Sequence, residues 1–172
     1  MFQLKNMLAV LAIFSCNTVS AQTSQLFQVS IDPEATILSL SGDQFQNHPG
    51  VEGNLNFFES DWFVESNTSA GASVTFSAGP FVNQGNPAYR RDTSLRLRNL
   101  RNRPGASWAF DNQADRTRYS NGKLSAVVTM SSAGAGTARV GMRVRFLTEL
   151  NPAGTLPAGS YVTTVTGTIS AN

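Results

Sequence analysis

Residues 137–147, TARVGMRVRFL, constrain the fold of this chain more than any other segment. Apolar side chains alternate along it with arginine, threonine or glycine; the apolar set is Ala138, Val140, Met142, Val144 and Phe146. A period of two is typical of a β-strand with one buried and one solvated face, because successive side chains of a strand point to opposite sides. Residues 94–98 repeat the pattern, with leucines between arginines. The sequence therefore predicts a sheet with a core face and a cationic face.

Strand patterns recur along the chain, and helical patterns do not. We expect strands at 26–31, 36–40, 62–65, 73–78, 94–100, 107–111, 123–131, 137–147 and 160–171. Segments rich in glycine, proline and asparagine separate them, as turns require. Many short strands joined by such turns indicate a single all-β domain, either an antiparallel sandwich or a barrel.

The first 21 residues resemble a secretory signal peptide. Lys5 precedes a short apolar stretch, residues 7–14, and Val19-Ser20-Ala21 supplies small residues where a signal peptidase would cut. The stretch is shorter than the roughly 20 residues that a membrane-spanning helix needs. We expect a cleaved signal over residues 1–21 and no transmembrane segment after cleavage. The alternative is a lipoprotein signal in which Cys16 carries the lipid.

Cysteine and histidine are too scarce for most catalytic and metal-binding chemistry. Cys16 is the only cysteine, so a chain without its signal has no disulfide, thiolate metal site or cysteine nucleophile. His48 is the only histidine, and nothing in the sequence marks a nucleophile and an acid to join it in a triad. We predict that the protein is not an enzyme and binds no cofactor or metal.

Charge is distributed unevenly along the chain. Residues 22–89 contain acids and neither lysine nor arginine, whereas residues 90–172 contain all eleven arginines, Lys123 and four acids. Two interpretations are open: acidic and basic strands lie side by side within one fold, or an acidic end of one subunit meets a basic end of the next. A formal net charge of +2 gives no reason to expect nucleic acid as a partner.

Aromatic and basic residues gather in residues 98–119. Arg101, Arg103, Trp108 and Tyr119 are a candidate surface for a glycan or an anion, because arginine stacks on aromatic rings and pairs with anions. That interpretation needs an exposed Trp108. In the alternative, Trp108 belongs to the core and the arginines lie on a solvated face.

The two ends of the chain after the signal carry a resemblance to a known family. Near the start, Phe27, Val29 and Ile31 alternate with polar residues before Asp32-Pro33, and the chain ends in NPAGTLPAGSYVTTVTGTISAN. Together these segments resemble the cysteine-free major subunits of chaperone–usher fimbriae of the colonisation-factor type. More loosely, the ending is similar to that of spore-coat-U-like secreted domains.

The resemblance implies an immunoglobulin-like sandwich, residues 36–172, that lacks one strand and is completed by a donor segment, residues 22–35, of another copy. Phe27, Val29 and Ile31 would be the donated side chains. The implied groove would be bordered by Tyr161, Thr163, Val165, Gly167 and Ile169. The implied partners are further copies, a periplasmic chaperone and an outer-membrane usher, on the way to the cell surface or the extracellular space. In the alternative, residues 26–31 complete their own domain, and the protein is a self-contained secreted sandwich that binds a glycan or surface polymer.

Overall fold

The computed structural model describes Leu26 and residues 28–49, 53–148 and 156–172. It divides the chain into two compact units, Met1–Ile31 and Asp32–Asn172. The predicted signal peptide, residues 1–21, and the candidate donor residue Phe27 lie outside the described residues.

The predicted strand at 26–31 is not formed in this structure. Leu26 and residues 28–31 have no regular secondary structure, and the side chains of Val29 and Ile31 are 87% and 80% exposed. A strand needs a neighbour that takes its main-chain hydrogen bonds. Among the described residues, no strand pairs with Leu26 or with residues 28–31.

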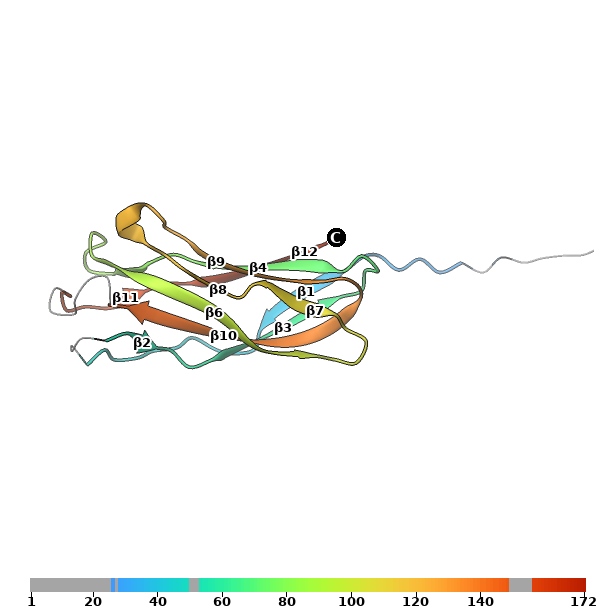
Figure 1. Ribbon diagram of the computed structural model, residues 1–172, viewed down its shortest axis with the longest axis horizontal. Coiled ribbons are helices and arrows are strands. Elements are labelled where there is room, and N and C mark those ends of the chain that lie inside the picture. Colours follow the sequence, from blue (N-terminus) through green and yellow to red (C-terminus); the bar gives the residue numbers. More distant parts are fainter. Residues whose placement is uncertain (1–25, 27, 50–52, 149–155) are drawn as a thin grey trace, which may run out of the picture. The chain divides into compact units, whose positions relative to one another are not determined.

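The unit Asp32–Asn172 is an all-β sandwich of two antiparallel sheets (Figure 1). The first sheet has the order β1-β3-β10-β6-β5-β11, with β2 also paired to β10 and β8 to β6. Its strands are β1 (Ala35–Ser39), β2 (Leu55–Asn56), β3 (Ser60–Ser66), β5 (Phe81–Asn83), β6 (Arg90–Asn102), β8 (Ala114–Arg116), β10 (Gly136–Leu147) and β11 (Tyr161–Val162). The second sheet has the order β12-β4-β9-β7. Its strands are β4 (Ala72–Ala78), β7 (Trp108–Asn112), β9 (Ala126–Ser132) and β12 (Val165–Ala171).

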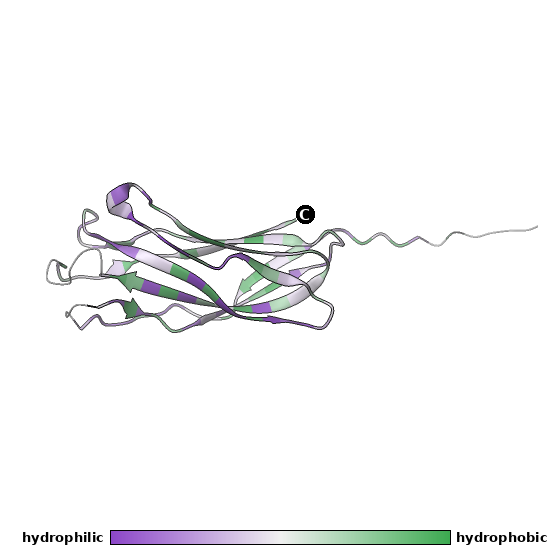
Figure 2. Ribbon diagram, viewed as in Figure 1, coloured by the Kyte–Doolittle hydropathy of each residue, from purple (hydrophilic) through white to green (hydrophobic). Residues whose placement is uncertain are grey.

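Alternating side chains of both sheets form one core. The buried residues of the first sheet include Val64, Leu95, Leu97, Val140 and Met142, and those of the second include Val74, Phe76, Val128 and Met130. The rings of Trp62 and Phe76 meet edge to face across the two sheets, with centroids 5.1 Å apart. Hydrophobic and hydrophilic residues alternate along β6 and β10 in Figure 2. The predicted all-β class and the two-sided pattern of residues 137–147 are therefore confirmed.

The predicted single strand at 160–171 is wrong, because the chain changes sheets within it. Tyr161 and Val162 pair with β5 of the first sheet, whereas residues from Val165 onward pair with β4 of the second. Between them, the Thr163 hydroxyl donates to the Gly79 carbonyl at 2.8 Å. Gly79 and Pro80 join β4 of the second sheet to β5 of the first, so the chain changes sheets here too, next to Thr163.

Candidate functional site

The two sheets end side by side in β1 and β12. β1 is the last strand of the first sheet and pairs only with β3, and β12 is the last strand of the second and pairs only with β4, among the residues that the structure describes. The two strands lie next to each other without pairing. We call this place the β1/β12 edge and define it by Ala35, Ile37, Val165, Gly167 and Ile169.

Apolar side chains at the β1/β12 edge are incompletely covered. Ala35, Ile37, Val165 and Ile169 pack against the buried core yet remain partly exposed, whereas the core residues of the strands further inside are almost fully buried. Along β12 the odd-numbered residues from Val165 to Ile169 are partly buried and Thr166 and Thr168 are exposed. The edge therefore presents apolar surface and the free side of an edge strand together, a combination that favours pairing with a further strand.

Gly167 allows β1 and β12 to approach each other. A Cβ at this position would lie 2.8 Å from Cδ1 of Ile37 and 3.2 Å from the ring of Phe76. Ile37 therefore occupies the space that a side chain of β12 would otherwise take. Sequence reasoning included Gly167 in the candidate site but missed Ile37, because only the packing of two sheets brings these residues together.

Asn67 fixes the point at which β1 begins. Its Oδ1 accepts a hydrogen bond from the Glu34 N–H at 2.6 Å, and its Nδ2 donates to the Asp32 carbonyl at 3.0 Å. The Asn67 N–H also donates to the Glu34 carbonyl at 3.1 Å. These three bonds tie the first residues of the domain, at the start of β1, to the end of β3.

The chain end is held at the turn between β3 and β4. The Asn172 N–H donates to the Gly71 carbonyl at 3.0 Å, and the Asn172 Nδ2 donates to the Ala70 carbonyl at 3.3 Å. Gly71 has a φ of +81°, and a Cβ there would lie 1.8 Å from the Ser132 carbonyl oxygen, so only glycine fits. β12 is paired with β4 from Val165 to Ala171. One side of the terminal strand is therefore secured within the chain itself.

Away from the β1/β12 edge, one segment of the chain runs from the second sheet to the first. β7 pairs with β9 of the second sheet, and after Gln113 the chain continues as β8, which pairs with β6 of the first. The Asn102 Nδ2 on β6 donates to the Trp108 carbonyl on β7 at 2.9 Å. We call this place the β7/β8 edge. It is joined across both sheets by one continuous segment.

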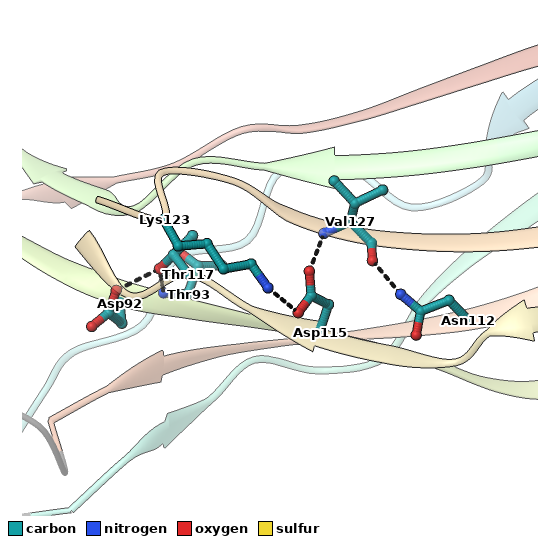
Figure 3. Close-up of polar contacts among 7 residues, drawn as sticks. All are labelled: Asp92, Thr93, Asn112, Asp115, Thr117, Lys123 and Val127. Carbon is teal, nitrogen blue, oxygen red and sulfur yellow. Dashed lines mark hydrogen bonds and ion pairs between the residues drawn. The ribbon is translucent and has the colours of Figure 1, made fainter. Parts of the chain in front are cut away.

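Polar side chains hold the β7/β8 edge to β9 (Figure 3). Asp115 accepts hydrogen bonds from the Val127 N–H at 2.9 Å and from the Lys123 Nζ at 2.5 Å, and the Asn112 Nδ2 donates to the Val127 carbonyl at 2.8 Å. Burial acts to raise the pKa of Asp115. The hydrogen bonds that its carboxylate accepts from Lys123, from the Val127 N–H and from the Arg116 N–H outweigh burial, together with the charge of Lys123, so the pKa is lowered.

A second, buried group of polar contacts lies at the start of β6. The Thr117 hydroxyl donates to Asp92 Oδ1 at 2.6 Å and accepts from the Thr93 N–H at 2.9 Å (Figure 3). The same carboxylate oxygen accepts from the Tyr119 N–H at 2.9 Å. These bonds fix the segment that follows β8 against the first sheet.

The structure does not form the candidate glycan or anion surface. Trp108 is 2% exposed, and its Nε1 donates to the Gly136 carbonyl at 3.1 Å, so its ring belongs to the core. Tyr119 lies beside Asp92 near the start of β6, whereas Arg101 lies nine residues further along that strand, about 30 Å away. Arg103 follows the same far end of β6. The alternative, a core Trp108, is correct.

Two of the five residues predicted to border a groove lie away from β12. Tyr161 belongs to β11, where its ring meets that of Phe146 with centroids 5.7 Å apart and its hydroxyl donates to the Pro157 carbonyl at 3.0 Å. Thr163 lies between β11 and β12. Val165, Gly167 and Ile169 do lie on β12.

Other kinds of site find little support within the described residues. These residues contain no group of three or more histidine, cysteine, aspartate or glutamate side chains that could hold a metal ion. The Nε2 atom of His48 lies 3.2 Å from the Gly53 carbonyl oxygen, and the imidazole ring contacts the ring of Phe146. The described part of the chain also has no helix with the length and hydropathy to cross a membrane.

In comparisons with known proteins, no family model matches the sequence and no curated protein matches it.

Proposed function

We propose that this protein is a secreted structural subunit of a bacterial surface fibre or coat, which polymerises by β-strand donation. The immunoglobulin-like topology, the chaperone and usher partners and the route through the periplasm follow from the resemblance of the two chain ends to fimbrial subunits. The observation that carries the proposal is the β1/β12 edge, where apolar core side chains are partly exposed beside an edge strand.

A donated strand would pair with the free side of β12 through main-chain hydrogen bonds, with every second side chain turned toward the core. Residues 26–31 have the required alternation, and the described apolar members Val29 and Ile31 are exposed. In the proposed fibre these side chains, with Phe27, cover Val165 and Ile169 of the next subunit. The terminal strand would then be held by β4 on one side and by a neighbouring subunit on the other.

The gain from donation is large relative to the stability of a domain. Burying Phe27, Val29 and Ile31 would contribute about 1.5–3 kcal/mol each, roughly 5–9 kcal/mol together. Whole domains are stable by about 5–15 kcal/mol. A subunit without a donated strand would therefore be only marginally stable and prone to associate through its edge, which is a reason for a chaperone to bind it first.

The first test compares the chain from Gln22 with a variant that begins at Asp32. The variant keeps β1 and the contacts of Asn67 with Asp32 and Glu34. We expect the longer chain to form multimers that resist SDS, and the variant to remain monomeric. A synthetic peptide of residues 22–31 should then raise the melting temperature of the variant.

A longer chain that stays monomeric on light scattering at all concentrations would contradict the proposal. In that case residues 26–31 would complete their own domain, as in a self-contained secreted sandwich. A scrambled peptide of the same composition is the control, because it keeps hydrophobicity and loses alternation.

A further inference from the structure

Arginines form a continuous ladder on the outer face of the first sheet. Outward positions of β10 and β6 make four rows, in which Arg145 is opposite Ser94, Arg143 opposite Arg96, Gly141 opposite Arg98 and Arg139 opposite Arg101. The residues between them, such as Leu95, Leu97, Val140 and Met142, are buried on the other face. We call the six arginines of these rows the arginine ladder. Every row contains at least one of them.

Acidic residues compensate the positive charge of the arginine ladder only in part within the described residues: Asp61 of β3 is opposite Gly141 on the same face. Arg143 is the only one of the six with an ion pair there, 4.0 Å from Glu59, and the same carboxylate accepts a hydrogen bond from Asn99. Gly141 makes room for Glu59, because a Cβ there would lie 2.1 Å from Glu59 Oε1. Two rows place arginines directly opposite each other, an arrangement that destabilises a sheet.

We infer that the arginine ladder binds a linear polyanionic carbohydrate, a chain that carries sulfate or carboxylate groups. An anion bound across the rows would remove the repulsion between the opposed arginines. Successive rows are about 7 Å apart, so the ladder extends about 20 Å along the strands. This line of charge along two paired strands, with a shift of register between the rows of Arg139 and Gly141, fits an extended polymer with repeated anionic groups. Guanidinium groups bind such oxyanions through paired hydrogen bonds.

Single-stranded nucleic acid is less well suited to this face, and duplex nucleic acid is left to the test below. Proteins that bind single strands combine positive charge with several aromatic rings on which successive bases stack. Among the described residues of β3, β6 and β10, the aromatic side chain next to the ladder on the outer face is Phe63, opposite Arg139. One ring cannot stack successive bases along the four rows.

The inference does not depend on strand donation. The arginine ladder lies on β6 and β10 of the first sheet, whereas a donated strand would pair with β12 of the second. A fibre would repeat the ladder once in each subunit and so increase the avidity for a long polymer. A monomer should still bind, because all six arginines belong to one chain.

The test measures binding of the purified chain to immobilised dextran sulfate over a series of salt concentrations, with neutral dextran as the reference polymer. We expect binding to dextran sulfate alone. Arg96→Gln and Arg101→Gln should each weaken it three- to tenfold at low salt and reduce the slope of log affinity against log salt by about one. Arg118→Gln is the matched control, since Arg118 is exposed, carries the same charge and lies outside the ladder.

Three results would overturn the inference: no binding to dextran sulfate at low salt, an equal loss in Arg118→Gln, or duplex DNA bound as tightly as dextran sulfate. The last result would assign the ladder to polyanions in general. Glu59→Gln gives an independent measurement in the opposite direction. It removes the counter-ion of Arg143 and keeps a hydrogen-bond acceptor for Asn99, so binding should become two- to fivefold tighter. Unchanged binding in Glu59→Gln would count against the ladder.

Discussion

The two edges of the sandwich are built in opposite ways. At the β7/β8 edge, one segment passes from the second sheet to the first, and Asn102, Asn112 and Asp115 hydrogen-bond main-chain groups of the neighbouring strands. At the β1/β12 edge, each sheet ends in a strand with one partner, and Ile37 and Ile169 are partly exposed. The same domain therefore contains one edge that its own chain completes and one edge available to a further strand.

Because the two edges differ, substitutions at one should change the stability of a single subunit, and substitutions that affect the other should change the association between subunits. Substitutions at the β7/β8 edge should lower the free energy of unfolding of a single subunit and leave the proposed assembly route intact. Substitutions in the donor segment should do the reverse, because Val29 and Ile31 are exposed.

Trp108→Ala should cause the largest loss of stability. The indole is 2% exposed and its N–H is bonded to the Gly136 carbonyl, so the change leaves a cavity and an unpaired acceptor in the core. We expect the free energy of unfolding, measured in urea on the variant that begins at Asp32 with the peptide of residues 22–31 added at a fixed concentration, to fall by about 3–5 kcal/mol. Phe58→Ala is the control: its ring is 77% exposed, and it should change stability by less than about 0.5 kcal/mol. Equal effects would mean that Trp108 does not stabilise the closed edge.

Val29→Asp in the chain from Gln22 should abolish assembly. Burying a carboxylate beside apolar side chains costs several kcal/mol, so association should weaken by about a hundredfold or more. Ser30→Asp introduces the same charge one position later, on the face that would point to solvent, and should weaken association by less than about threefold. Analytical ultracentrifugation measures both. Similar losses in the two variants would show that charge alone, and not alternation, governs association.

The sequence predicted the interior of this fold better than its edges. Alternation marked β6 and β10, because a strand buried on one face needs a period of two whatever its neighbours are. It could not show that residues 160–171 change sheets, since Val162 and Val165 suit either sheet equally. β8 has the sequence Ala-Asp-Arg and pairs only through its place beside β6, so no pattern revealed it.

The candidate sites divide in the same way. Val165 and Ile169 were implied as site residues by the resemblance of the chain end to fimbrial subunits, and both pack against the core at the β1/β12 edge. Trp108 had two open interpretations, because an aromatic residue near arginines can belong to a core or to a binding surface; burial decided between them. The arginine ladder was visible as cationic positions of two strands. Its rows depend on the register of β10 with β6, which the sequence does not contain.

Asp115→Asn should cause a moderate, pH-dependent loss at the β7/β8 edge. The pKa of Asp115 is lowered from 3.8 in the folded protein, so its ionised form stabilises the fold above pH 4, and this contribution disappears as the pH falls through the lowered pKa. At pH 7 the variant should be less stable by about 1 kcal/mol, because the bonds from Val127 and Lys123 weaken. The difference, measured by urea unfolding, should shrink towards pH 2. A difference independent of pH would exclude the charge of Asp115 as its cause.

Gly167→Ala should have the smallest effect on a single subunit and is the sharpest probe of the β1/β12 edge. The new Cβ would lie 2.8 Å from Cδ1 of Ile37, the mobile end of a side chain, and 3.2 Å from the ring of Phe76. Ile37 can turn away and the ring can shift by a few tenths of an ångström, at a cost of about 1 kcal/mol. It would turn toward the space that a donated strand is proposed to fill. Melting of the variant that begins at Asp32 should therefore change little, while the peptide of residues 22–31 should bind about tenfold more weakly. Gly71→Ala is the contrasting change, since its Cβ would meet a main-chain oxygen at 1.8 Å and must destabilise the domain itself. Unaltered peptide binding in Gly167→Ala would show that the donated strand does not contact β12 near Ile37, and the acceptor site would then have to be sought elsewhere on the domain.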